Sequence, residues 1–328
     1  MTVPDSSRRL VTVFGGSGFL GRYVVRALAQ RGYRILVAVR RPDLAGHLQP
    51  YGTVGQIKAI QANLRYRWSV DRAVEGADAV VNLVGILAPQ GRQSFEAVQA
   101  FGPRAIAEAA RGAGITRLVH VSAIGADAQS AIGYLRSKGL GERGVLETVP
   151  EAVVMRPSTL FGPGDGFFRR FAAMSRLSPV LPLFGSGQTR FQPVFAGDVG
   201  EAVARGVDGL ARPGTIYELG GPEIMTFREI LERVLAETGR RRALLPLPFW
   251  LARTMGRVLE LLPGAPLTAD QVRMLERDNV VSEAAAAEGR TLAGLGIAPT
   301  AAEIILPTYL SAYREYGQFT QIRPGAQP

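Results

Sequence analysis

Tyr134 and Lys138 have the residue types and the spacing that could do chemistry together. Residues four apart lie on one face of a helix, so a helix over "YLRSK" would place the phenol beside the ammonium. Lys138 is also one of only two lysines in a chain whose other basic residues are all arginine. Three interpretations are open: a catalytic couple, a cofactor clamp without chemistry, or an accident of sequence.

A glycine-rich segment near the N-terminus predicts a dinucleotide site. Gly15, Gly18 and Gly21 recur every three residues in "VTVFGGSGFLGRYVV", directly after an apolar run and at the start of a helical pattern. The first glycine permits a tight turn, the second lets a pyrophosphate approach the backbone, and the third lets helix and strand pack closely. The N-terminus of the helix would then face the phosphates.

The end of the second apolar run predicts which nucleotide binds. An acidic residue there would hold a ribose 2′-hydroxyl, but this run ends "VAVRR", with Arg40 in that place, Arg41 beside it and Arg22 just after the third glycine. A guanidinium pairs with a 2′-phosphate that a carboxylate would repel. The sequence therefore favours NADP(H) over NAD(H), against the alternative that these arginines form a solvated face.

Composition narrows the class further. The chain has no cysteine and only two histidines, His47 and His120, so we expect no disulfide and no metal site. We interpret His120, in the apolar run "RLVHVSA", as a packed strand residue. The net charge of +10 suggests an anionic partner, but nothing resembles a nucleic-acid-binding motif, so nucleic acid is not expected.

The ends and the apolar segments carry no membrane or export signal. "MTVPDSSRRLVTVFGG" runs almost directly into a strand, and no segment approaches the roughly 18–20 uninterrupted apolar residues of a membrane span. We expect a soluble or peripheral protein facing a reducing compartment.

Strand and helix patterns alternate through the first 157 residues, which predicts a parallel sheet with helices on both faces. After that point proline and glycine become frequent and loops dominate. We therefore predict an α/β, Rossmann-type doubly wound domain over 1–157 and a smaller, interleaved C-terminal lobe over 158–328. The predicted strands are 9–14, 33–40, 55–63, 77–85, 117–123 and 152–157; the predicted helices of the second half are 167–177, 197–208, 226–239, 248–262, 267–278 and 299–317.

These features resemble the short-chain dehydrogenase/reductase superfamily in its extended and atypical branches. The resemblance adds Ser122, twelve residues before Tyr134, and covers nearly the whole chain. It implies that Tyr134 is the acid/base, that Ser122 holds the substrate oxygen, and that Lys138 binds the nicotinamide ribose and lowers the pKa of the phenol. The implied cofactor site comprises Gly15, Ser17, Gly18, Phe19, Leu20, Gly21, Arg22, Arg40, Arg41, Asn63, Leu64, Val84, Gly85, Tyr134, Lys138, Pro157 and Leu160.

Longer runs in the second half are similar to the bacterial form of the NAD(P)H-binding accessory subunit of respiratory complex I. These runs are "RPSTLFGPGDGFFRRFA", "LTADQVRMLERDNVVS" and "LGIAPTAAEIILPTYLSAYREYGQF". The resemblance implies a tightly bound, structural NADPH and core subunits near the junction of the peripheral and membrane arms as partners. It also implies a cytoplasmic location, peripheral on the inner membrane.

Two other functions stay open at this point. The chain could be an active NADP-dependent reductase, epimerase or dehydratase that uses Tyr134, Lys138 and Ser122, or an NADP(H) redox sensor. The segment "RRRALLPLPFWLARTMGRVLELLPG" is basic and amphipathic, which is typical of a helix on an anionic membrane or a partner. An ordinary core helix of the small lobe is the alternative.

Overall fold

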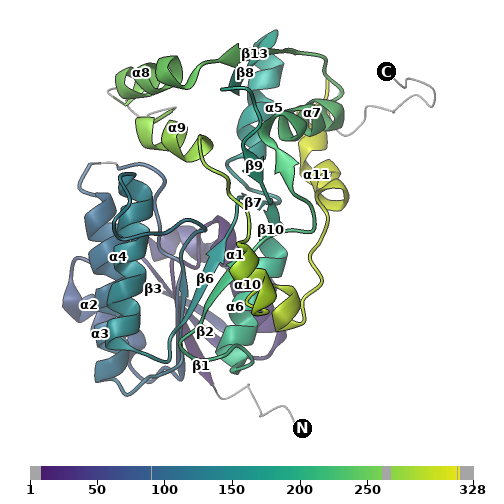
Figure 1. Ribbon diagram of the computed structural model, residues 1–328. Helices are drawn as coiled ribbons and strands as arrows, with labels where there is room; N and C mark the ends of the chain where they lie inside the picture. Colours follow the sequence, from purple (N-terminus) through teal and green to yellow (C-terminus); the bar gives the residue numbers. More distant parts are fainter. Residues whose placement is uncertain (1–8, 90, 261–266, 316, 318–328) are drawn as a thin grey trace.

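The computed structural model describes residues 9–89, 91–260, 267–315 and 317. In this part of the chain the largest sheet has seven parallel strands, in the order β11-β6-β5-β4-β1-β2-β3. Figure 1 shows this sheet with helices on either side of it. The order runs outward in both directions from the gap between β1 and β4, which is where such sheets bind ligands at their carboxyl edge. The strands are β1 (Leu10–Phe14), β2 (Arg34–Val39), β3 (Ile57–Gln61), β4 (Ala79–Asn82), β5 (Leu118–Val121), β6 (Val153–Pro157) and β11 (Ile216–Leu219).

Alternating side chains of the central strands are buried on opposite faces of the sheet. Val13 lies in register with Val37 of β2 and Val81 of β4, and all three are fully buried in one core cluster. Phe14, the next residue, is buried in the cluster on the other face. A strand that is covered on both sides needs apolar residues at every position, which is why these strands could be predicted as continuous apolar runs.

Helices cover both faces, so the predicted Rossmann-type fold is confirmed. The first face packs against α1 (Phe19–Gln30) and α6 (Ala196–Asp208), which are joined by ion pairs from Arg31 to Glu201 and, at 2.9 Å, to Asp208. The second face packs against α2 (Arg67–Val74), α3 (Gly102–Gly112) and α4 (Gly133–Thr148). A π-helical segment, η3 (Glu96–Phe101), leads directly into α3, and a 3₁₀ segment, η2 (Pro42–Tyr51), follows β2.

All six predicted strands are observed, but the sheet has a further strand that the sequence did not predict. Residues 216–219 form β11, which pairs with β6, and α6 packs against α1 although it follows residue 158. The chain therefore leaves the sheet after β6 and returns to it with α6, on one face, and β11, at the edge. We keep 1–157 and 158–328 as a proposed division, with α6 and β11 as the segments that cross it.

The small lobe is built on short strands and a core of phenylalanine rings. Phe161, Phe168 and Phe227 are fully buried in this core, which α11 also enters through Leu306. Its strand pairs are β7 (Leu160–Phe161) with β10 (Val194–Phe195), β8 (Val180–Phe184) with β13 (Ala243–Leu247), and β9 (Arg190–Phe191) with β12 (Met225–Thr226). Its helices include α5 (Phe168–Leu177), α7 (Phe227–Thr238), α8 (Phe249–Leu259), α9 (Ala269–Leu275), α10 (Glu283–Ala287) and α11 (Ala302–Leu310), with 3₁₀ turns η4 (Ala293–Leu295) and η5 (Ser311–Tyr313).

The predicted helices of the second half correspond to α5, α6, α7, α8, α9 and α11. Several are shorter than predicted: α9 ends at Leu275, and α11 gives way to η5 after Leu310. Residues 261, 262 and 316 of the predicted helices lie outside the described residues. No helix in the described ranges is long and apolar enough to cross a membrane.

Candidate cofactor site at the carboxyl edge of the sheet

The glycine turn has the geometry that a dinucleotide requires. Gly15 has a positive φ of 78° and its amide donates to the carbonyl of Ala38 at 3.1 Å, which ties the turn to β2. Gly18 stands at the N-cap of α1 and supplies no side chain to that helix end, so the first amides remain available to an anion. A Cβ on Gly21 would overlap the carbonyl of Gly16, so only glycine permits this packing of helix on strand.

The end of β4 lies directly against this turn. A Cβ on Gly15 would stand 3.2 Å from the amide nitrogen of Val84. Asn82, which is 1% exposed, fixes this segment: its Oδ1 accepts from the amide of Val84 at 3.0 Å, and its Nδ2 contacts His120 Nδ1 at 3.1 Å. The structure therefore brings together two segments that are almost 70 residues apart in the sequence.

Lys138 lies at the same edge. Its ammonium donates to the carbonyl of Val121 at 3.2 Å and would stand 3.3 Å from a Cβ on Gly85. Burial lowers the pKa of Lys138 to about 8, although the carboxylate of Glu142 acts in the opposite direction. Glu142 is itself held by two hydrogen bonds from Arg156, at 2.9 and 2.6 Å.

Several polar atoms at this edge are buried without a hydrogen-bond partner in the described structure. They include Ser122 Oγ and His120 Nε2. Burial, with a further contribution from the charge of Lys138, lowers the pKa of His120 to about 3, so the imidazole is neutral. This agrees with the interpretation of His120 as a packed strand residue. Polar atoms left without partners are a feature of sites that a ligand completes. With the glycine turn and the uncapped helix, they fit a nicotinamide dinucleotide.

The side chain of Tyr134 has a different environment from those of Lys138, Ser122 and His120. It packs edge-on against Phe95, with 5.9 Å between ring centroids, and its hydroxyl has no hydrogen bond within the described residues. Burial raises the pKa of Tyr134 to about 12, and no charge offsets it. The phenol is therefore protonated near neutral pH, and the effect of Lys138 on it when a nucleotide is bound stays a prediction.

Gln99 is a site residue that the sequence did not reveal. It is 1% exposed, its Oε1 accepts from the amide of Ile86 at 2.8 Å, and its Nε2 donates to Ser137 Oγ at 2.9 Å. It lies in η3, and a π-helical turn often marks a functional position. On α4, a Cβ on Gly141 would overlap the carbonyl of Gln99, so this close approach sets the position of the helix that carries Lys138. The feature of the sequence that could have identified Gln99 is a glutamine within the largely apolar segment "EAVQAF".

The small lobe reaches the site through α9. Asp270 Oδ2 accepts from the amide of Tyr134 at 3.4 Å and would stand 2.9 Å from a Cβ on Gly133, at the N-terminus of α4. A carboxylate is favourable at that end of a helix. Gln271 also contacts the carbonyl of Leu87 at 3.5 Å. Helix α9 therefore lies over the side of the site where Tyr134 stands.

The three arginines that were predicted to pair with a 2′-phosphate make different contacts in the structure. Arg40 and Arg41 are exposed after β2, with Arg41 paired to Asp43 at 3.1 Å, whereas the guanidinium of Arg22 lies against Gly164.

The remaining predicted cofactor residues are held by local contacts. The amide of Asn63 donates to Ser69 Oγ at 3.0 Å, and Leu64 packs on Gly102. The carbonyl of Pro157 accepts from the amide of Ile124, and Leu160 pairs with Val194. Ser17, Phe19 and Leu20 are partly buried around the start of α1. None of these contacts tests whether the residues bind a nucleotide, so those roles stay predictions.

Known proteins of similar sequence extend over most of the chain. Residues 11–220 match the model of the NAD dependent epimerase/dehydratase family. The rat protein named NADH dehydrogenase (ubiquinone) 1 alpha subcomplex subunit 9, mitochondrial, is 33% identical over 94% of this chain and 81% of its own length. The Neurospora crassa protein named NADH-ubiquinone oxidoreductase 40 kDa subunit, mitochondrial, is 32% identical over 92% and 79%.

Two further similarities are informative. A Caulobacter vibrioides protein named ceramide reductase is 36% identical, but over 54% of each chain. The solved structure of the dTDP-glucose 4,6-dehydratase DesIV from Streptomyces venezuelae, with NAD bound, superposes with a TM-score of 0.69 over 93% of this chain and 97% of the other, at 20% identity. This last likeness shows the fold. The chain belongs to the NAD dependent epimerase/dehydratase family and, within it, to the family of NADH dehydrogenase (ubiquinone) 1 alpha subcomplex subunit 9.

Proposed function

We propose that this protein is an NADPH-binding accessory subunit of respiratory complex I without independent turnover. The observation that carries the proposal is the extent of the similarity: the relatives named as complex I subunits match both lobes, whereas the relative named as a reductase matches about half of the chain. The test is co-purification of a tagged chain with complex I core subunits from native membranes. Isolation of the tagged chain without any core subunit would refute the proposal.

The state of Tyr134 supports a structural role for the nucleotide. A catalytic tyrosine needs a pKa near the working pH, but burial raises the pKa of this phenol to about 12. Lys138, in contrast, lies where it can bind a ribose whether or not a hydride is transferred. The purified protein should therefore keep NADPH bound and unoxidised in the presence of carbonyl compounds.

We infer that NADPH is preferred over NADH. Arg40 and Arg41 stand at the end of β2 with exposed side chains, and Arg40 has no carboxylate partner within the described residues. A charge-assisted pair with a 2′-phosphate would discriminate between the nucleotides by about tenfold or more. Arg40→Asp should weaken NADPH binding and leave NADH binding nearly unchanged; equal affinity of the variant and the wild type for NADPH would refute the inference.

Helix α8 buries small residues and exposes large apolar ones, which is the reverse of the usual arrangement and indicates a contact surface. The small residues Ala252 and Gly256 of α8 are buried, and Gly256 packs on α9, where a Cβ would stand 2.9 Å from the amide of Ala269. Phe249 packs on the core of the small lobe, but most of the other large apolar residues face outward: Trp250 is 65% exposed and Val258 60%. A soluble protein usually buries large apolar side chains, so a continuous exposed set marks a contact surface.

We call this surface the α8 face: Trp250, Leu251, Met255 and Val258, with Leu245 of β13 and the exposed Arg257. Apolar side chains with cations beside them suit an anionic membrane surface. We propose that the α8 face contacts the cytoplasmic side of the inner membrane, near the junction of the complex I arms.

The two tryptophans provide a matched test of the α8 face. Trp68, on α2, is also 65% exposed but lies outside this surface. Trp250→Ser should reduce sedimentation with vesicles that contain phosphatidylglycerol, and Trp68→Ser should not. Equal sedimentation of the two variants would refute a membrane contact through α8.

An NADP-dependent reductase of a lipid-like carbonyl compound is the second candidate function. Its support is the 36% identity to the protein named ceramide reductase, together with the buried, unpartnered Ser122 Oγ beside the Lys138 segment. Steady oxidation of NADPH that depends on a carbonyl substrate, and that Tyr134→Phe abolishes, would establish this function and displace the first.

A further inference from the structure

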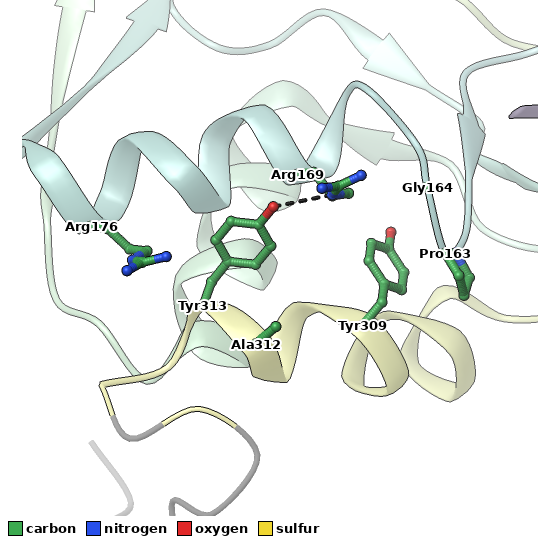
Figure 2. Close-up of a pocket in the computed structure, with 7 residues that line it drawn as sticks. All are labelled: Pro163, Gly164, Arg169, Arg176, Tyr309, Ala312 and Tyr313. Carbon is green, nitrogen blue, oxygen red and sulfur yellow. Dashed lines mark hydrogen bonds between the residues drawn. The ribbon is translucent and has the colours of Figure 1, made fainter. Parts of the chain in front are cut away.

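A cavity of about 360 Å³ lies in the small lobe (Figure 2). It is bounded by the loop after β7, by α5 and by the C-terminal end of α11 with η5. Arg169 and Arg176 enter from α5, and Tyr309 and Tyr313 stand opposite them. Pro163 and Gly164 close the end next to the loop.

The two arginines are presented together. A spacing of seven residues returns to the same face of a helix two turns on, about 10 Å along its axis. Arg169 Nε donates to the hydroxyl of Tyr313 at 3.1 Å, which fixes one guanidinium at the cavity. Both arginines are exposed, and neither forms an ion pair with a carboxylate within the described residues, although the buried carboxylate of Asp165 is near enough to act on Arg169.

In a second cavity of the same protein, carboxylates compensate the charges of the arginines that line it. Arg156 and Arg290 line a space of about 450 Å³. Arg156 is paired with Glu142 at 2.6 Å and with Glu218 at 3.8 Å, and Arg290 with Glu288 at 2.6 Å. Arginine at a cavity wall is therefore not enough by itself to leave a positive charge. The α5 cavity differs because its cations are unpaired.

The inner wall of the α5 cavity is formed by a tyrosine and a carboxylate that interact with each other. The hydroxyl of Tyr309 lies against the buried carboxylate of Asp165 and hydrogen-bonds it. Burial, and then the charge of Asp165, raise the pKa of Tyr309, so the hydroxyl keeps the proton that it donates to Asp165. Asp165 is 2% exposed and accepts from the amide of Arg169 at 3.2 Å.

The balance of charge remains positive. Asp165 is the carboxylate that these contacts identify, and burial raises its pKa. Against it stand the two arginines that line the cavity, Arg169 and Arg176.

We propose that the α5 cavity binds a phosphate group. A guanidinium donates two parallel hydrogen bonds to phosphate oxygens, and the hydroxyl of Tyr313, which accepts from Arg169, adds a neutral donor. At roughly 30 Å³ for each water molecule, the cavity would hold about twelve waters, which is room for a pyrophosphate or for a phosphate ester. The residues that line the cavity differ from those of the predicted nucleotide site and of the α8 face.

The test is calorimetric titration of the NADPH-saturated protein with inorganic pyrophosphate, so that the nucleotide site cannot contribute. The wild type should bind one pyrophosphate, and Arg169→Gln/Arg176→Gln should weaken binding about tenfold or more. Arg72→Gln/Arg111→Gln removes the same number of exposed, unpaired charges from α2 and α3 and should bind like the wild type. Retained affinity in the α5 double variant, or no binding by the wild type at millimolar pyrophosphate, would overturn the proposal.

Two further arms define the source of the phosphate. Arg169→Lys/Arg176→Lys keeps the charge and should recover part of the affinity, which a merely structural role of the arginines would not predict. Soluble short-chain phosphatidylglycerol should compete with pyrophosphate for the α5 cavity if the ligand is a lipid headgroup. If it does not compete, the phosphate belongs to a soluble ester. Both results support the site.

Discussion

The two lobes bury their cores with different side chains. The sheet of the large lobe is packed with valine and alanine, as in the register of Val13 with Val37 and Val81. The small lobe instead gathers phenylalanine rings around Phe227, whose ring centroid lies 5.5 Å from that of Phe171 and 5.8 Å from that of Phe184. The rings come from several helices and short strands.

The lobes also differ in the groups that their own packing leaves exposed or without a partner. The large lobe leaves polar atoms without partners at its carboxyl edge, among them Ser122 Oγ. The small lobe leaves apolar side chains outward on the α8 face and unpaired arginines at the α5 cavity. These differences support the proposed nucleotide site in the large lobe and the proposed contact surfaces in the small lobe. Four predictions test this comparison.

The largest effect should come from the aromatic core. Phe227→Ala removes a ring that is 1% exposed and should lower the free energy of unfolding by about 3–5 kcal/mol. Denaturation is followed by fluorescence in variants that keep one tryptophan, since Trp250 reports the small lobe and Trp68 the large one. The transition of Trp250 should shift most. Phe101→Ala, at a site that is 70% exposed, is the control. Equal shifts at both tryptophans would mean that the lobes unfold as one unit.

The next effect should be at the cofactor edge. Lys138→Ala should weaken NADPH binding by about 10- to 100-fold, because a hydrogen bond to a charged group contributes about 1.5–3 kcal/mol. Lys58→Ala removes the only other lysine, which is exposed on β3, and should leave the affinity unchanged. Fluorescence titration with NADPH measures both. Loss of less than threefold in Lys138→Ala would contradict the assignment.

A smaller effect should appear with pH. The pKa of Lys138 is lowered from 10.5 to about 8 in the free protein, so the folded state releases this proton earlier than the unfolded state. Between these values the unfolded state binds more protons, and the contribution of Lys138 to stability increases with pH. If the nucleotide needs the ammonium, its affinity should instead fall by up to about tenfold per pH unit above pH 8.

The control for this pH profile is Lys138→Ala, whose weak binding should not change in the same range. Tyr134, with a pKa of about 12, would act only at higher pH. A wild-type affinity that stays constant from pH 7 to 10 would show that the ammonium is not required.

The smallest effect should come from Tyr134→Phe. The hydroxyl has no hydrogen bond within the described residues, so its removal should change NADPH affinity and the free energy of unfolding by less than about 0.5 kcal/mol. Assembly with complex I should also persist. A large loss of binding would place the phenol on the nucleotide.

Local patterns explain why much of the fold could be predicted. The six strands were apolar runs of β-branched residues, and the glycine turn followed the first of them directly. Strand β11 was missed because its four residues, "IYEL", become a strand only through pairing with β6. Helix α6 was predicted, but its packing on α1 depends on contacts between residues such as Arg31 and Asp208, far apart in the chain.

The candidate cofactor site could be predicted from the sequence to about the same extent as the fold. The sequence indicated Gly15, Val84, Gly85 and Lys138, and the structure brings these four together. It did not indicate Gln99 or Asp270, because their importance comes from hydrogen bonds to segments distant in the sequence. Nor did it indicate the outward apolar side of α8, since the periodicity of a helix does not say which face is covered.

The sequence by itself determined the parallel sheet, the glycine turn and the placing of Tyr134 and Lys138 on one helix, because each depends on residue type and short spacing. Only the tertiary structure decided the protonation of these two side chains. Desolvation depends on everything packed around a group, and here it moves the pKa of Lys138 down and that of Tyr134 up. The same dependence on distant neighbours leaves Arg169 and Arg176 unpaired while Arg156 and Arg290 are neutralised.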